Sequence, residues 1–209
     1  RGSSSRVYRV EREGGTGFAK ELALKVLAPD VTPTDDLVQM LVDEARVTSQ
    51  LHHRNIAAVH EFGRHDVGFY LVMDWIEGLD LRRLLRRLRA RGLWLPVSAA
   101  VEIGVQILDG LQHAHSRLDD AGLPLGIVHR DINPGNVLVS SSGCVVLTDF
   151  GLARVNLGDD TDAGTTRGTA RFMSPEQARG GGLDGRSDQF SVGSLLYIML
   201  AGRLPFTGR

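Results

Sequence analysis

The sequence predicts an α+β protein with two lobes, a small β-rich lobe over residues 1–75 and a mainly helical lobe over residues 76–209. Apolar residues before residue 75 alternate or form short runs, which is typical of strands. After residue 81 they recur with the spacing of helices. The length of 209 residues is enough to bury a substantial core, as one large domain or as two small ones.

The first lobe is expected to contain five strands and one helix. Strand-like spacing is found at residues 7–10, 21–27, 56–62 and 69–73. The turn-rich segment 13–17 joins the first two of these into a hairpin. Because that segment lies between strands and precedes no helix, we interpret its glycines as a turn and not as a phosphate-binding loop. Asp35 and Asp36 can cap a helix that runs to about Leu51.

The second lobe is expected to be helical, with short strands near its middle. Helical spacing is found at residues 81–91, 97–118 and 187–200, and strand-like runs at residues 137–139 and 145–147. The segment 187–200 is apolar on nearly all sides, which predicts a helix that is buried on every face.

Composition sets limits on partners and compartment. The formal net charge is −1, which gives no general reason to expect nucleic acid or a membrane surface as a partner. No run approaches the roughly 18 apolar residues of a membrane span, so we expect no membrane contact within this segment. The single cysteine, Cys144, cannot form an intramolecular disulfide and fits a reducing compartment. We therefore expect a cytoplasmic protein.

The most informative motif is the run His-Arg-Asp-Ile-Asn-Pro-Gly-Asn at residues 129–136, followed by Asp-Phe-Gly at residues 149–151. This pattern resembles the catalytic core of the protein kinases, and in particular of the bacterial eukaryotic-like (Hanks-type) Ser/Thr kinases. The resemblance implies a two-lobed kinase fold whose C-terminal lobe is truncated at its C-terminal end. It also implies transfer of the γ-phosphate of ATP to Ser/Thr hydroxyls of a protein substrate. Asp131 would orient the attacking hydroxyl, and Asn136 and Asp149 would hold Mg²⁺, which prefers oxygen ligands.

Two further charged residues resemble the kinase pair that positions the phosphates. Lys25 lies on the strand-like segment 21–27 among apolar neighbours, and on its own it would more often be a solvated lysine. A glutamate on the following helix changes that interpretation, because an ion pair would direct the lysine head toward the phosphates. Glu44 matches the family pattern, and its neighbour Asp43 is the alternative.

The resemblance assigns further residues to the nucleotide. They are Gly2, Val7, Ala23, Lys25, Asp74, Ile76, Asp80 and Leu138. Gly2 would belong to a Gly-rich loop, although Ser5 stands where a third glycine is usual and a cloning scar is the alternative for residues 1–5. The backbones of Asp74 and Ile76 would bind the adenine edge, with Met73 as gatekeeper. Asp80 would reach the ribose, and an ordinary helix N-cap is the alternative.

A second motif is specific to protein kinases and argues against a phosphotransferase of small molecules. Ser174-Pro175-Glu176 stands where the activation segment of the family ends with Ala-Pro-Glu. An arginine directly before the catalytic aspartate, here Arg130, typically binds a phosphate on that segment, because guanidinium matches phosphate bidentately. The resemblance therefore implies Thr165, and after it Thr166, as regulatory phosphosites.

Two features leave alternatives open. Asn133 stands where Ser/Thr kinases usually carry a lysine that contacts the transferred phosphate, which admits a pseudokinase that binds nucleotide or docks without catalysis. The intact set of Lys25, Glu44, Asp131, Asn136 and Asp149 argues against that alternative. Arginines also cluster on the helix expected after residue 81: Arg82, Arg83, Arg86, Arg87, Arg89 and Arg91. We interpret them as a solvated face, with an acidic partner or substrate as the alternative.

Overall fold

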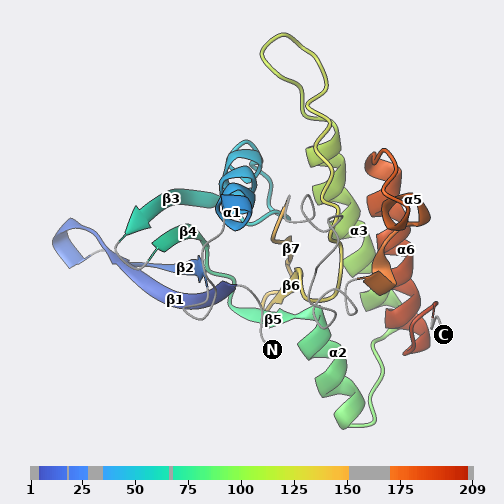
Figure 1. Cartoon of the computed structure of the whole chain (residues 1–209). Helices are drawn as coiled ribbons and strands as arrows, with labels where there is room; N and C mark the ends of the chain where they lie inside the picture. The colour runs from blue at the N-terminus through green and yellow to red at the C-terminus, as the bar shows by residue number, and fades with distance from the viewer. Residues whose placement is uncertain (1–4, 18, 28–34, 66–67, 151–169, 207–209) are drawn as a thin grey trace.

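The protein has two lobes joined at residues 75–77 (Figure 1). The computed structural model describes residues 5–17, 19–27, 35–65, 68–150 and 170–206. A twisted sheet and helix α1 (Asp35–Thr48) form the N-terminal lobe, and the longer helices form the C-terminal lobe. The two-lobed α+β architecture expected from the sequence is confirmed.

The N-terminal sheet is antiparallel and has the strand order β1-β2-β4-β3. Its strands are β1 (Ser5–Glu13), β2 (Ala19–Leu27), β3 (Val59–His65) and β4 (Gly68–Asp74). A short 3-10 turn, η1 (Gly15–Gly17), connects β1 to β2, so the predicted hairpin is present. The described residues before residue 75 thus form four strands where five were expected. The segment that was expected to begin a strand at Ile56 makes only an isolated bridge to Leu147 before β3 begins.

A second, three-stranded sheet lies in the C-terminal lobe, with the order β5-β6-β7. It consists of β5 (Gly78–Asp80), β6 (Val137–Ser140) and β7 (Val145–Leu147). Strand β5 was not predicted, and it follows the connection between the lobes directly. A Cβ at Gly78 would overlap the backbone carbonyl oxygen of Val139, so only glycine allows this close pairing of β5 with β6.

Helices make up the rest of the C-terminal lobe. They are α2 (Leu81–Ala90), α3 (Val97–His115), the 3-10 turn η3 (Ala170–Phe172), α5 (Pro175–Ala178) and α6 (Gly185–Ala201). Helix α3 ends three residues before the predicted Leu118, because Leu118 pairs with Pro124 in a segment that projects from the lobe (Figure 1). None of the described helices combines the length and the apolar character that a membrane crossing requires.

The main core lies where α3 and α6 pack together and against β7. Ile107, Leu111, Leu147 and Leu195 are all fully buried there. The apolar pattern of its sequence had suggested that helix α6 is buried on every face, but one side of the helix is exposed. Its residues Tyr197 and Leu200 are 38% and 48% exposed, so the apolar pattern correctly predicted a helix but was wrong about one of its sides.

Asp188, in the first turn of α6, fastens the core to the segment that precedes Asp131. Its carboxylate is 1% exposed and accepts hydrogen bonds from the backbone N–H groups of His129 and Arg130, both at 2.9 Å. The ring of His115 on α3 donates a third hydrogen bond at 2.8 Å. One buried carboxylate therefore ties two helices to this loop.

We predict that Asp188→Asn lowers the free energy of unfolding by about 1–3 kcal/mol, because an amide nitrogen cannot accept the hydrogen bond that one buried N–H donates. Chemical denaturation of both proteins measures the change. Asp109→Asn, the same substitution at an exposed position of α3, should change stability by less than about 0.5 kcal/mol. Equal stability of the two variants would contradict the prediction.

Candidate functional site

The buried ammonium of Lys25 lies at the centre of the site. Lys25 is 3% exposed on β2, and Glu44 is 2% exposed on α1. The Nζ atom of Lys25 donates to both carboxylate oxygens of Glu44, at 2.9 and 2.8 Å, and to Oδ1 of Asp149 at 2.7 Å. Two carboxylates from opposite lobes thus share one cation, and the predicted pair of Lys25 and Glu44 is formed.

Burial and charge divide the protons unequally within this group. Burial would lower the pKa of Lys25, but the charges of Asp149 and Glu44 outweigh it and raise that pKa. Burial raises the pKa of Glu44 to about 8, although Lys25 opposes the rise. For Asp149 burial is again unfavourable, but here the ammonium prevails and lowers the pKa of the carboxyl. Lys25 therefore holds Asp149 ionised, whereas burial makes Glu44 the more basic of the two carboxylates.

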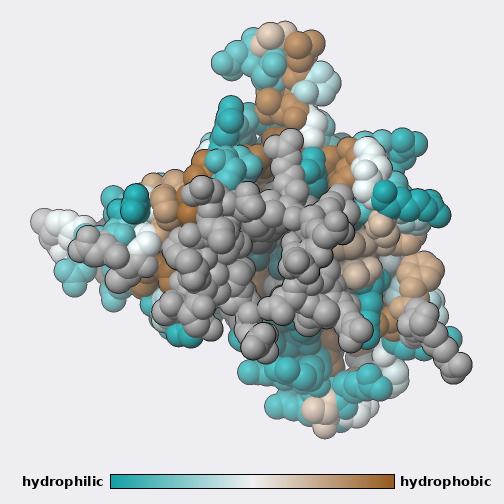
Figure 2. All heavy atoms as spheres, in the orientation of Figure 1, coloured by the Kyte–Doolittle hydropathy of each residue, from teal (hydrophilic) through white to brown (hydrophobic). Residues whose placement is uncertain are grey.

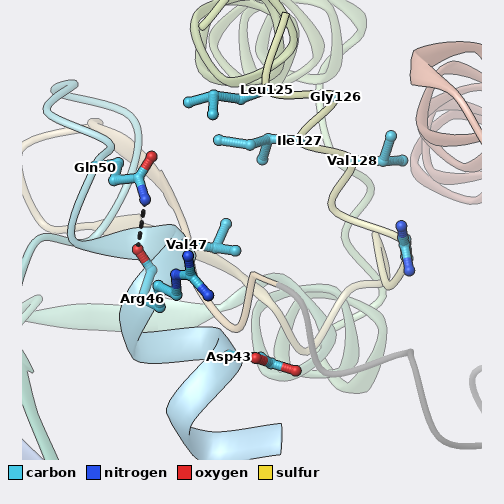
Figure 3. A pocket seen from close by; sticks show the side chains of 9 residues that line it. Asp43, Arg46, Val47, Gln50, Leu125, Gly126, Ile127 and Val128 are labelled. Atoms are coloured by element: carbon cyan, nitrogen blue, oxygen red, sulfur yellow. Dashed lines mark hydrogen bonds between the residues drawn. The ribbon is translucent and has the colours of Figure 1, made fainter. Parts of the chain in front are cut away.

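Asp43, the alternative to Glu44, faces elsewhere. It lines a hollow of about 290 Å³ between α1 and residues 125–130, together with Arg46, Val47 and Gln50 (Figure 3). None of the residues predicted to bind nucleotide lines this hollow. Helix α1 thus directs one acid into the site and the preceding one away from it, as neighbouring positions of a helix must.

The hairpin of β6 and β7 brings Asn136 and Asp149 together. Asn136 directly precedes β6, and Asp149 lies two residues after β7. The N–H of Thr148 donates to the carbonyl of Asn136 at 3.0 Å, which closes the ends of the hairpin. Asp149 has φ of 63°, a conformation that a residue with a side chain adopts at a cost. The surrounding hydrogen bonds hold it there.

Asp131 is held by two amides of its own loop. The Nδ2 atom of Asn133 donates to Oδ1 of Asp131 at 3.0 Å, and the Nδ2 atom of Asn136 donates to Oδ2 at 2.8 Å. Burial raises the pKa of Asp131, and these two hydrogen bonds oppose the rise. The carboxylate therefore has a fixed orientation and a basicity above that of a solvated aspartate.

The buried side chain of His129 supports this loop. Its ring lies 4.4 Å from the ring of Phe150, and both residues are fully buried. Nδ1 of His129 accepts from the backbone N–H of Asp131 at 3.3 Å, so Nε2 carries the proton that bonds the Thr148 carbonyl at 2.9 Å. The ring thus links the backbone of Asp131 to that of Thr148. Arg130 has φ of 68°, a second strained position in this loop.

Arg82 is a site residue that was not singled out from the sequence. Its Nη2 atom donates to Oδ1 of Asn133 at 3.1 Å, and its backbone N–H donates to the carbonyl of Pro134 at 2.9 Å. A Cβ at Gly135 would lie 2.5 Å from Nη2, so this glycine leaves room for the guanidinium. The signal in the sequence was the unusual density of arginines on this helix, which did not reveal which of them reaches the loop.

One face of the N-terminal sheet carries the residues predicted to contact the base. Val7 lies opposite Lys25 in the register of β1 and β2, and Ala23, two residues before Lys25, shares its side of β2. Met73 lies opposite Ala23 on β4. Ala23 and Met73 are buried, whereas Val7 is 57% exposed. An apolar surface therefore adjoins the lysine.

The connection between the lobes carries the other predicted nucleotide residues. The N–H of Asp74 donates to the carbonyl of Ala58 at 3.0 Å, and Ile76 lies in the short segment before β5. Asp80 is the N-cap of α2, because its Oδ1 atom accepts from the N–H of Arg83 at 2.8 Å. Leu138 pairs with Asp80 across β5 and β6. The N-cap alternative for Asp80 is confirmed, and contact with a ribose stays a prediction.

The oxygen atoms of Asn136 and Asp149 fit a hard divalent cation. An amide oxygen and an ionised carboxylate are ligands that Mg²⁺ prefers, and Lys25 keeps Asp149 ionised. The amide nitrogen of Asn136 bonds Asp131, which turns the amide oxygen away from that carboxylate. Gly2, Thr165 and Thr166, which the sequence analysis also assigned, lie outside the described residues.

Comparison with known proteins gives this site a family context. The family model described as the protein kinase domain matches residues 1–209. The serine/threonine-protein kinase PknL of Mycobacterium tuberculosis is 39% identical over 208 residues, which cover 99% of this chain and 48% of that protein. The tyrosine-protein kinase MasK of Myxococcus xanthus is 33% identical over 207 residues, which cover 99% of this chain and 32% of that protein. The chain spans about a third to a half of the length of these curated relatives.

A solved structure shows the same architecture. The kinase domain of Mycobacterium tuberculosis PknI matches with a TM-score of 0.72 and 28% sequence identity, covering 99% of this chain and 73% of that chain.

The buried ammonium makes Lys25→Met a test of the electrostatics of the site. We expect the variant to lose about 2–3 kcal/mol of unfolding free energy near neutral pH, because two buried carboxylates lose their cation. Their pKa values in the folded state then rise, and they bind protons that the unfolded chain releases. The deficit should therefore be full at about pH 8 and shrink toward about pH 5.

Chemical denaturation at both pH values measures this deficit. Lys20→Met is the matched control, since Lys20 lies on the same strand with its side chain 50% exposed, and it should cost less than about 0.5 kcal/mol. A deficit for Lys25→Met that does not depend on pH would show that lost packing, and not charge, is responsible.

Proposed function

This chain belongs to the protein kinase family, and we propose that it transfers the γ-phosphate of ATP to serine and threonine hydroxyls of proteins. One observation carries the proposal. Asp131, the carboxylate that would orient the hydroxyl, is hydrogen-bonded to Asn136, and Asn136 is joined through the β6–β7 hairpin to Asp149 and so to Lys25. The groups that phosphoryl transfer requires are thus connected by hydrogen bonds and by this hairpin.

Each of these residues has a distinct role in the proposal. Lys25 binds the phosphates of the nucleotide, and Glu44 fixes the direction of its side chain. Asp131 accepts a hydrogen bond from the substrate hydroxyl, orients its oxygen toward the γ-phosphorus and takes up its proton. The raised pKa of Asp131 suits it to accept that proton.

Asn136 and Asp149 would hold Mg²⁺ in this proposal. When bound, the ion neutralises charge on the nucleotide phosphates. Asp149 is kept ionised for that purpose by Lys25. Because Lys25 donates directly to Asp149 in this structure, binding of nucleotide and metal would require the ammonium to exchange part of this contact for phosphate oxygens.

The nucleotide base would lie between the lobes. Val7, Ala23 and Leu138 supply apolar contacts, and the backbones of Asp74 and Ile76 bind the edge of the adenine. Asp80 would also accept a hydrogen bond from a ribose hydroxyl, because a carboxylate that caps a helix can accept further hydrogen bonds. Gly2 would cover the phosphates through its backbone.

The acceptor residue and the regulation are also proposals. PknL is named a serine/threonine kinase and MasK a tyrosine kinase, so the acceptor is best identified by phosphoamino-acid analysis of the product. We propose Thr165, followed by Thr166, as sites whose phosphates would meet Arg130. The reaction consumes ATP, so we place it in the cytoplasm.

A second candidate is a pseudokinase that binds nucleotide or a partner without catalysis. One contact favours it: Asn133, which stands in the position usual for lysine, donates to Asp131. Both oxygens of Asp131 are thereby engaged by amides of the loop. A substrate hydroxyl would have to share Oδ1 with Asn133, which a carboxylate oxygen allows because it accepts more than one hydrogen bond.

A transfer assay with labelled ATP and Mg²⁺ distinguishes the two candidates. We predict that the wild-type protein transfers phosphate at a rate well above that of Asp131→Asn, in which the amide cannot take the proton. Asn133→Lys should raise the rate by about 10–1,000-fold, because it adds a charge near the developing negative charge of the transferred phosphate. If the wild type and Asp131→Asn are equally inactive and only Asn133→Lys transfers phosphate, the pseudokinase candidate is correct.

The hydrogen bond of Asn133 also predicts a pH effect. Asn133→Leu removes a donor that stabilises the Asp131 carboxylate, so the pKa of Asp131 should rise further above its usual range. Activity that depends on the carboxylate is lost as the pH falls through this pKa. We therefore expect the acidic limb of kcat/KM to move to higher pH by about one unit. An acidic limb that does not move would show that Asp131 is not the group that titrates.

A further inference from the structure

A row of arginines on helix α2 leads away from the proposed catalytic loop. Helix α2 carries five arginines and no acidic residue, and a sixth arginine, Arg91, is its C-cap. Hydrophilic side chains cover this helix (Figures 1 and 2). Leu84 and Leu85 pack against the core, so the arginines face outward. Residues three and four apart share one side of a helix. Three arginines follow one another in this way: Arg82, Arg86 and Arg89.

The three arginines of this row have no carboxylate partner within the described part of the chain, in which Arg83 pairs with Asp80 at 3.1 Å. At the head of the row, the guanidinium of Arg82 contacts Asn133 at 3.1 Å beside Gly135. Asn133 itself donates to Asp131. The side chain of Asn133 therefore links the first arginine of the row to the proposed catalytic carboxylate.

We propose that this row binds acidic side chains of the protein substrate on one side of the acceptor hydroxyl. The proposal rests on the proposed kinase function and adds a substrate class to it. From Arg82 to Arg89 the helix rises about 10 Å, which an extended peptide covers with three to four residues. Aspartate or glutamate residues within that distance of the acceptor would face the guanidinium groups while the hydroxyl reaches Asp131.

The attraction would come from the local positive charge of α2. The whole chain has a net charge of −1 and so gives no general attraction for an acidic peptide. Exposed ion pairs are individually weak, so the row should act through several contacts and chiefly on the KM for the substrate. Such contacts are screened by salt. Acidic substrates should therefore be preferred most strongly at low ionic strength.

Three peptides of one length and one acceptor test the proposal. Their flanking positions carry glutamate, glutamine or lysine. We expect the full-length protein to phosphorylate the glutamate peptide with a kcat/KM about tenfold above that of the glutamine peptide, and the lysine peptide least well. Added salt should reduce the difference between the peptides.

Two variants with the same loss of charge identify the surface. The double variant R86Q/R89Q should lose most of the preference for the glutamate peptide. The control R87Q/R91Q removes two charges from another side of α2 and from its C-cap, and it should keep the preference. Arg82 is left unchanged, because its contact with Asn133 would mix recognition with catalysis. Equal losses in the two variants would assign any preference to general charge and overturn the proposal.

Hydrolysis of ATP without peptide is measured in parallel to separate this proposal from the kinase function. If the wild type phosphorylates the glutamate and glutamine peptides equally well, the substrate proposal is wrong and the kinase function stands. If it neither hydrolyses ATP nor phosphorylates any of the peptides, the proposed function fails, and the substrate proposal fails with it.

Discussion

The arrangement of the lobes depends on one buried cation, the ammonium of Lys25. A charge removed from water is costly unless it is paired and hydrogen-bonded, and this one has partners in both lobes, Glu44 on α1 and Asp149 after β7. Any displacement of α1 would separate Glu44 from Lys25, and the buried ammonium would then be incompletely paired. The lysine thus couples the position of a helix to the geometry of the loop that carries Asp149. This coupling explains how the Glu44 side chain can be buried, since both of its carboxylate oxygens accept from the ammonium.

The proposed catalytic loop is held in a strained shape by contacts from three directions. Arg130 and Asp149 both have positive φ, which neither side chain favours. The carboxylate of Asp188 binds the backbone on both sides of the bond between His129 and Arg130. The ring of His129 then connects Asp131 to Thr148, the residue that follows β7. Strain of this kind persists only where the surroundings determine the backbone more than once, and here helix α6, the histidine ring and the hairpin all do so.

The sequence predicted the parts of the site that follow from short-range patterns. The strand around Lys25 and the helix around Glu44 were expected from the spacing of their residues, whereas their ion pair was expected from the resemblance to the protein kinases. Contacts that depend on packing were not predictable in the same way. Arg82 reaches Asn133 across 51 positions of sequence because α2 packs beside the loop and Gly135 lacks a side chain. The exposed side of α6 could not be located from its residues, because apolar composition favours burial but does not say which sides of a helix its neighbours cover.

The pairing of Asn133 with Arg82 changes where positive charge lies near Asp131. A lysine in the loop would bring its own charge to the transferred phosphate. Asn133 brings an amide, whose oxygen is held by Arg82 and by the N–H of Gly135 at 2.8 Å, so its nitrogen is directed at Asp131. The cation therefore stands on a neighbouring helix, one residue farther from the carboxylate. In the proposed reaction a charge placed there would act weakly on the reacting phosphate. Because Arg82 is exposed, the same charge would be open to the acidic side chains of a substrate, as we propose for α2.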